Sequence, residues 1–189
     1  MVDELRDIQL ADAEAIAEVE NRAYRDLDPN LLIEGRLAQA GDRVAKGITR
    51  NSERGVVVPG PDGLLGVSLW RPCGDPVVTS HLHLLYIDPD TQRSGLGARL
   101  LRVHWERSLE TWPDLSLFTL NCLKGSHWAL SFYKKQGYSI AKPGDEERVP
   151  GLSAYLDLPP SPGRPSRPPY FANLYQSAAT VREKLSAEQ

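Results

Sequence analysis

The chain has 189 residues, of which 41% are hydrophobic and 25% are charged, and its formal net charge is −3 at pH 7. That length fits one domain with a single buried core and a short appendage. The mildly acidic balance argues against a general nucleic-acid binder, which usually has a strongly basic face, and the apolar stretches are far shorter than the roughly 20 residues that span a bilayer.

The first half of the chain predicts a strand, two helical regions and a hairpin. The strand is expected over Leu5–Leu10, and a helix over Ala11–Leu27 has apolar residues at helical spacing, with Asp12 as its N-cap. Residues Asn30–Ile48 predict a second, less regular helical region that is broken at Gly41. Two strands with a turn of Pro, Gly and Asp between them follow over Arg54–Arg71.

The second half predicts strands and helices in alternation. Strands are expected over Val77–Ile87 and Leu115–Leu123, and two more over Tyr138–Ala141 and Leu152–Leu158. Helices are expected over Gly97–Trp112, stopped by a proline, and over Ser126–Gly137, closed by its last glycine. The order of these elements predicts an α/β fold, a central mixed sheet flanked by helices.

The tail differs in composition from the rest of the chain. Pro159–Pro169 contains six prolines in eleven residues, which predicts an extended linker between a domain over residues 1–158 and the remaining residues 170–189. From Tyr170 to Leu185 apolar residues recur at helical spacing, so a short amphipathic helix is expected there. That helix could dock on its own domain, on a second copy in a homodimer, or on another partner, and all three alternatives stay open.

The N-terminus and the cysteines bear on location and on metal binding. The first residues, MVDELRDIQL, lack the basic flank and apolar core of a secretory signal. Cys73 and Cys122 match no metal-ligand spacing, and the four histidines form no paired ligand motif. A disulfide between the two cysteines would be unusual in a reducing compartment. We therefore expect a cytoplasmic protein that uses no metal and binds neither nucleic acid nor membrane.

A glycine turn separates the strand Val77–Ile87 from the helix that follows it. A nucleotide-binding P-loop needs Gly-Lys-Ser/Thr at this place, but Gly97 is followed by Ala98 and Arg99. A dinucleotide fingerprint needs a third glycine, where this chain has Leu100. Small residues at a helix N-terminus still let backbone N–H groups converge on an anion such as a pyrophosphate. A helix start that merely needs tight packing is the alternative.

Two patterns then occur in one chain. The first is Gln92, Gly95 and Gly97 in the turn, and the second, on the later helix, is Ala129, Tyr133, Gly137 and Tyr138. In both patterns, and in the order of its elements from Leu5 to Leu158, the chain resembles the GNAT acetyltransferase superfamily. The resemblance implies transfer of an acetyl group from acetyl-CoA to a primary amine of a small molecule or a protein, in one ternary complex.

The resemblance also implies which residues hold the cofactor. The pantetheine would pair with the backbone near Tyr86 and Ile87, and the pyrophosphate would lie on the turn. Asn121 stands where many members have a glutamate, and Ser126 stands where many have an asparagine; each could still hydrogen-bond the cofactor. The cofactor-binding residues so implied are Tyr86, Ile87, Gln92, Arg93, Ser94, Gly95, Leu96, Gly97, Ala98, Asn121, Ser126 and Tyr133.

Catalytic roles are implied for two residues. The family's matching tyrosine often donates a proton to the departing CoA sulfur, which makes Tyr133 the expected acid. His81 and His83 alternate with leucines on their strand, and His83 is the candidate to relay a proton from the amine. The acceptor would contact the region Asp28–Asn51 and an acidic loop that carries Asp145. Because the glutamate is missing, a catalytically weak CoA-binding regulatory or interaction module stays as the alternative function.

Overall fold

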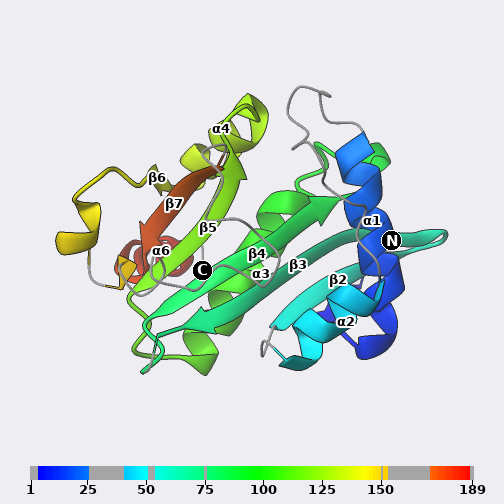
Figure 1. Ribbon diagram of the computed structural model, residues 1–189, viewed down its shortest axis with the longest axis horizontal. Coiled ribbons are helices and arrows are strands. Elements are labelled where there is room, and N and C mark those ends of the chain that lie inside the picture. Colours follow the sequence, from blue (N-terminus) through cyan, green and yellow to red (C-terminus); the bar gives the residue numbers. More distant parts are fainter. Residues whose placement is uncertain are drawn as a thin grey trace. The chain divides into compact units, whose positions relative to one another are not determined.

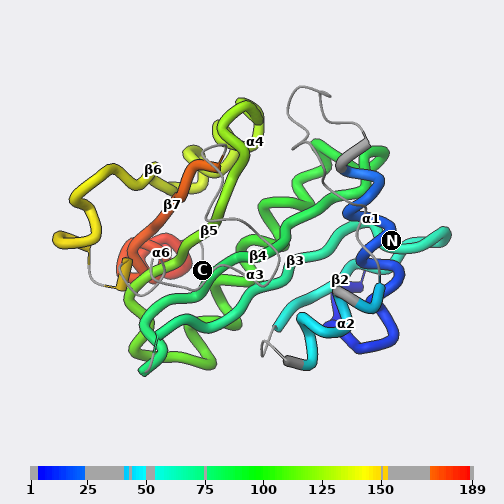
Figure 2. The backbone as a smooth tube through the Cα atoms, viewed as in Figure 1, coloured from blue at the N-terminus to red at the C-terminus, as the bar shows by residue number. Residues whose placement is uncertain are grey.

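The computed structural model describes residues 4–25, 41–50, 54–74, 76–149, 151–152 and 171–187 (Figures 1 and 2). The proline-rich segment 159–169, most of the strand expected over Leu152–Leu158 and most of the acceptor region Asp28–Asn51 lie outside the described residues. Among the described residues, no helix has the length and apolar character needed to cross a membrane.

The strands form a mixed seven-stranded sheet in the order β1-β2-β3-β4-β5-β7-β6, which confirms the predicted fold class. The β1–β2 and β2–β3 pairs are antiparallel, β4 runs parallel to β5, and β7 is antiparallel to both β5 and β6. The strands are β1 (Arg6–Asp7), β2 (Arg54–Gly60), β3 (Gly63–Cys73), β4 (Thr79–Ile87), β5 (Leu117–Leu123), β6 (Ser139–Ile140) and β7 (Phe171–Ser177).

The helices agree closely with the expected ones. The helix predicted over Ala11–Leu27 is present as a 3-10 turn followed by α1, and the second helical region is described from Gly41 onward, where α2 begins. The α-helices are α1 (Ala13–Arg25), α2 (Gly41–Arg50), α3 (Leu96–Thr111), α4 (His127–Lys135) and α6 (Ala178–Ala187). Three 3-10 helices are also described, at η1 (Leu10–Asp12), η3 (Pro89–Thr91) and η4 (Asp145–Glu147).

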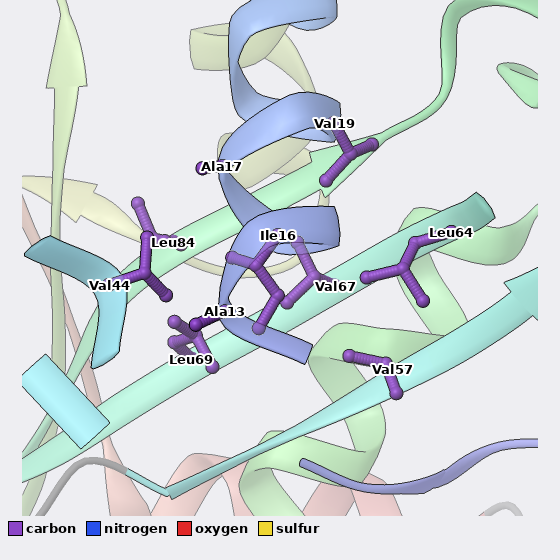
Figure 3. Close-up of a cluster of buried hydrophobic side chains, with 10 residues drawn as sticks. All are labelled: Ala13, Ile16, Ala17, Val19, Val44, Val57, Leu64, Val67, Leu69 and Leu84. Carbon is purple, nitrogen blue, oxygen red and sulfur yellow. The ribbon is translucent and has the colours of Figure 1, made fainter. Parts of the chain in front are cut away.

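Residues Met1–Arg71 and His83–His104 form one compact unit. Its core, shown in Figure 3, joins the apolar face of α1 to one face of β2, β3 and β4. Ile16 and Val19 on α1 recur at helical spacing, are fully buried and belong to one cluster with Val67 and Leu84. Val67 alternates with Gly66, whose missing side chain leaves room for α3 on the opposite face.

Residues Pro72–Leu82 and Trp105–Gln189 form the second compact unit. Its centre is β5, which is paired on one side with Thr79–Leu82 of β4 and on the other with β7 along its whole length. Buried residues of β5 include Leu117, Phe118 and Leu120, and Leu174 of β7 is fully buried beside them.

The prediction of one amphipathic helix over Tyr170–Leu185 is wrong for its first half. Phe171–Ser177 is strand β7, and only Ala178–Ala187 is helical. Along β7 buried and half-buried residues alternate, with Ala172, Leu174 and Gln176 buried, which is the period of a strand rather than of a helix. The tail therefore completes the sheet instead of forming a separate appendage.

Helix α6 docks on its own unit. The guanidinium of Arg182 donates hydrogen bonds to the backbone carbonyls of Pro113 and Leu115, the latter at 3.4 Å. The ammonium of Lys184 donates to the Oε1 atom of Gln136 at 3.2 Å and lies 5.1 Å from the centre of the Trp105 indole. These contacts favour the first of the three docking alternatives.

Candidate functional site

The predicted glycine turn lies between β4 and α3, and its backbone has an uncommon shape. Arg93 has a φ of 63° and Gly95 a φ of 86°, both in the left-handed region. A Cβ atom on Gly95 would meet nothing within 4 Å, so the backbone conformation, and not a lack of space, calls for glycine there. Gln92, Arg93, Ser94 and Gly95 are all exposed.

The start of the turn is bonded to β3. The backbone N–H of Asp88 donates to the carbonyl of Leu65 at 2.9 Å. The Thr91 hydroxyl donates to the carbonyls of Asp88 and Leu65, at 3.0 and 3.3 Å. These bonds hold the short helix η3 against the sheet. They thereby fix the direction in which the chain continues from β4 into the turn.

Helix α3 begins directly after the turn, at Leu96, whose side chain is buried. The N–H groups of a helix's first turn have no acceptor within the helix, and here they belong to Leu96, Gly97 and Ala98. The helix dipole adds partial positive charge at the same end. A Cβ on Gly66 would lie 2.9 Å from Cδ1 of Leu100, so β3 and α3 pack closely and keep this helix end in place. The arrangement suits an anion such as a pyrophosphate.

The end of β4 carries the residues predicted to meet the pantetheine and to relay a proton. Its parallel register with β5 ends at the pair Leu82–Leu120, so His83, Tyr86 and Ile87 lie beyond the last registered pair. All three side chains are half-buried. The phenol of Tyr86 donates a hydrogen bond of 3.3 Å to the carboxylate of Glu20 on α1.

Helix α4 carries the predicted acid. Tyr133 is half-buried, and its ring meets those of Phe132 and Tyr138 edge to face at centroid distances of 5.1 and 5.8 Å. Tyr138 itself is buried and accepts a hydrogen bond of 3.1 Å from the indole N–H of Trp105. Burial raises the pKa of Tyr138 well above its usual value, so that phenol stays protonated. Of the two tyrosines, only Tyr133 has the exposure that an acid needs.

Ser126 and Asn121 precede α4 and differ in exposure. Ser126 is the N-cap residue of α4, and its hydroxyl is buried with no hydrogen-bond partner among the residues that the structure describes. A buried hydroxyl in that state is costly unless a ligand or water completes it, which fits the predicted cofactor contact. Asn121 is exposed on β5, opposite Asn173 of β7.

The outer face of α4 borders a hollow of about 440 Å³. Its lining combines one histidine, one serine and two lysines with a single leucine: His127, Leu130, Ser131, Lys134 and Lys135. Both lysines are exposed and lie in the last turn of α4. This is the kind of surface on which a phosphate group can be neutralised.

Three residues considered from the sequence are less available for chemistry than their types suggest. His104 is fully buried against Trp70, and burial lowers its pKa to about 3, so it stays neutral. Cys122 is buried, and burial raises the pKa of its thiol to about 11. His81 is buried and hydrogen-bonds the Thr119 hydroxyl at 3.1 Å. Within the described ranges, no group of three or more potential ligands could hold a metal ion.

The acidic loop expected to attract an amine uses one of its carboxylates internally. The carboxylate of Asp145 accepts the backbone N–H of Lys142 and the guanidinium of Arg148, each at 2.8 Å. These bonds, the first above all, lower the pKa of Asp145. Glu146 and Glu147 remain exposed. One of the loop's negative charges, that of Asp145, is therefore used in bonds that stabilise the loop itself.

Residues 52–140 match the family model described as the acetyltransferase (GNAT) domain, and this range contains the glycine turn and α4. Over these residues the chain is similar to GNAT acetyltransferase domains. It is 29% identical, over 152 residues, to the S-(2-succino)cysteine N-acetyltransferase of Bacillus subtilis (strain 168), a match that covers 77% of this chain and 88% of that protein.

Solved structures of N-acetyltransferases share the fold. One is the PaiA N-acetyltransferase of Thermoplasma acidophilum in complex with coenzyme A, with a TM-score of 0.68, 14% identity, and coverage of 94% of this chain and 99% of that one. Another is the ribosomal-protein-S18-alanine N-acetyltransferase of Escherichia coli, with a TM-score of 0.61, 15% identity and 93% coverage of both chains.

Proposed function

We propose that this protein transfers the acetyl group of acetyl-CoA to a primary amine of a small molecule or a protein, in a direct ternary complex. The observation that carries the proposal is the turn from Gln92 to Ala98. Its left-handed residues lead into the N-terminus of α3, and it lies inside the region that matches the GNAT domain. A turn of this shape supplies convergent N–H groups for a pyrophosphate.

Acetyl-CoA would then be held by residues of three kinds. The N–H groups from Arg93 to Ala98 would bind the pyrophosphate, with the exposed guanidinium of Arg93 as a further cation and Gln92 beside it. The backbone of Tyr86 and Ile87 would pair with the pantetheine. The buried Ser126 hydroxyl and the exposed Asn121 amide supply further hydrogen-bonding groups. The lysines of the α4 hollow could neutralise a phosphate of the same ligand.

The chemical step removes two protons from the acceptor nitrogen, adds one to the CoA sulfur and needs no covalent enzyme intermediate. The ammonium form of the acceptor must lose a proton, which His83 would take up directly or through water. The neutral amine attacks the thioester carbonyl, the C–S bond breaks, and the amine's second proton leaves as the amide forms. Tyr133 would donate a proton to the departing sulfur and be restored by that released proton. Positioning of amine against thioester supplies much of the acceleration.

The proposals for the acceptor, the compartment and the assembly rest on the relatives, the cysteines and one exposed aromatic side chain. The relatives include enzymes named for S-(2-succino)cysteine and spermidine, and both names denote amines. A cytoplasmic location would bring the enzyme together with acetyl-CoA and accords with the two buried thiols. A homodimer is compatible with the exposed indole of Trp128, which is 65% exposed.

Thermal unfolding with acetyl-CoA, and with ATP and NAD as controls, tests the cofactor. A ligand that binds only the native state stabilises it by about 2.7 kcal/mol at a hundredfold excess over its Kd, which raises the melting temperature by several degrees. Amines such as S-(2-succino)cysteine, spermidine and a peptide with N-terminal alanine can then be compared by release of the CoA thiol. A shift with ATP or NAD alone would contradict the proposal, and binding of acetyl-CoA without turnover of any amine would favour the regulatory alternative.

A further inference from the structure

Helix α1 is bonded through two side chains to the end of β4 and the start of the glycine turn. Glu20 accepts the phenol O–H of Tyr86 at 3.3 Å, and two residues further along both segments Arg22 forms an ion pair of 3.0 Å with Asp88. All four residues belong to the same compact unit. The contacts link residues that lie 66 positions apart in the chain.

These two polar contacts come in addition to the apolar packing of α1 on the sheet, in which the Tyr86 ring also takes part. The apolar residues of α1 already fill the core shown in Figure 3, yet Glu20 is fully buried on the same helix. A buried carboxylate is costly unless hydrogen bonds compensate it. Arg22 is 30% exposed and Asp88 15%, so their ion pair is shielded from water more than a surface pair is. Arg22 also reaches the carbonyl of Leu64, at 3.4 Å.

The two oxygens of the Asp88 carboxylate have different tasks. Oδ2 pairs with the guanidinium of Arg22, and Oδ1 accepts the backbone N–H of Asp90 within η3. The same residue's backbone N–H is bonded to Leu65. Asp88 therefore joins α1, β3 and η3 immediately before the exposed residues of the turn, and its side chain sets where that turn begins.

We propose that Glu20 and Arg22 of α1 are positioning residues for acetyl-CoA, which act through Tyr86 and Asp88. This inference rests on the proposed function. Neither α1 side chain needs to touch the cofactor. Arg22 holds Asp88 and with it the entry into the phosphate turn, and Glu20 holds the Tyr86 ring, whose backbone is the predicted partner of the pantetheine. A change in α1 at these two positions then alters cofactor affinity.

Variants of Asp88 and Arg22 separate this role from general stability. Asp88→Asn keeps the oxygen that accepts the Asp90 N–H and removes the charge that pairs with Arg22. Arg22→Gln removes the partner charge, and Arg22→Lys, which retains it, should recover part of the affinity. Asp90→Asn, which changes an exposed carboxylate in the same turn, is the matched control for Asp88→Asn, and Glu18→Gln, which changes an exposed carboxylate, is the control on α1.

The test is the Kd of CoA measured by calorimetry, together with the melting temperature of each protein without ligand. We expect Asp88→Asn and Arg22→Gln to weaken CoA about tenfold, since each removes half of a shielded charge pair. The loss should be the same with dephospho-CoA, which keeps the pyrophosphate and lacks the ribose phosphate. Both controls should bind CoA as the wild type does.

Each outcome decides a separate question. If the wild type does not bind CoA, the proposed function fails before α1 is tested. If the wild type binds and the folded variants keep its Kd, with only their melting temperatures lowered, α1 has a structural role and this inference is wrong. A loss that disappears with dephospho-CoA would also overturn it. If Asp88→Asn does not fold, the comparison of Arg22→Gln with Arg22→Lys decides.

Discussion

The indole N–H of Trp105 donates a hydrogen bond of 3.1 Å to the phenol oxygen of Tyr138, whose ring stands edge to face with the ring of Tyr133. The bond ties α3 to the end of α4 within one compact unit. Tyr138 is also stacked on Trp105, with ring centroids 6.4 Å apart. The ring next to the predicted acid is therefore fixed by both packing and a hydrogen bond.

Replacing Tyr138 by Phe should reduce stability while leaving the packing in place. The variant keeps the ring but leaves the buried N–H of Trp105 without its acceptor, which costs about 1–3 kcal/mol. Urea unfolding measures the change, and the slope of the transition should stay constant because the exposed surface does not change. An unaltered free energy of unfolding would mean that another acceptor or water replaces the phenol.

Tyr133→Phe tests the predicted acid. If the phenol protonates the departing sulfur, kcat should fall by about 10²-fold or more, since general acids contribute about 10²–10⁴-fold. The Kd of acetyl-CoA should change little, because the ring and its contacts with Phe132 and Tyr138 remain. Once an acceptor amine is known, steady-state kinetics and calorimetry give both values. A variant with undiminished kcat would leave Tyr133 as a packing residue.

Local patterns in the sequence predicted much of the fold and the location of the turn. Alternation along β3 and β4, helical spacing in α1 and glycines at the start of α3 are all properties of neighbouring residues, and the structure confirms these elements. The prediction went wrong for Phe171–Ser177, where the spacing of apolar residues suits a helix as well as a strand. Pairing with β5, which begins 54 residues earlier (Leu117 against Phe171), decides in favour of the strand.

The contacts behind the candidate site could not be predicted in the same way. Glu20 is one of several acidic residues on its helix, and nothing local marks it as the acceptor for Tyr86. Asp88 precedes a proline, as a turn residue often does, but its pairing with Arg22 depends on how α1 lies on the sheet. Gly66 could be noticed only as a glycine inside a strand, a position that often marks close packing.

Gly95→Ala and Gly144→Ala form a matched pair that tests the turn. Both glycines have left-handed φ angles, 86° and 84°, and a Cβ on either would meet nothing within 4 Å. Each substitution should therefore cost about 1–2 kcal/mol of stability from backbone strain alone. Only Gly95→Ala should also weaken CoA, because its turn is the predicted pyrophosphate site.

Thermal unfolding and calorimetry on the two variants give the comparison. Equal losses of stability with a CoA Kd raised only in Gly95→Ala would support the turn as the phosphate site. An unchanged Kd in Gly95→Ala would contradict it, and a raised Kd in Gly144→Ala as well would show that the effect of Gly95 is not specific to the turn.

Acid should remove stability that Asp12 contributes near the N-terminus. Arg6 donates two hydrogen bonds to the Asp12 carboxylate, at 2.7 and 2.8 Å, and this contact lowers the pKa of Asp12 in the folded protein. A carboxyl group whose folded pKa is depressed binds its proton more readily when the chain is unfolded. Its contribution is therefore complete above the unfolded pKa of about 3.9 and is lost as the pH falls through the lower folded value.

The Asp12→Asn variant should accordingly be less stable than the wild type at pH 7 and should approach it as the pH falls below about 4. Urea unfolding at pH 7, 4 and 3 measures the difference, and Glu18→Gln on α1 is the control, because Glu18 is exposed and its free energy of unfolding should follow the wild type throughout. Other carboxylates titrate in the same range, so the decisive quantity is the gap between Asp12→Asn and the wild type at each pH. A gap that stays constant from pH 7 to pH 3 would mean that the bond to Arg6 does not distinguish the two protonation states.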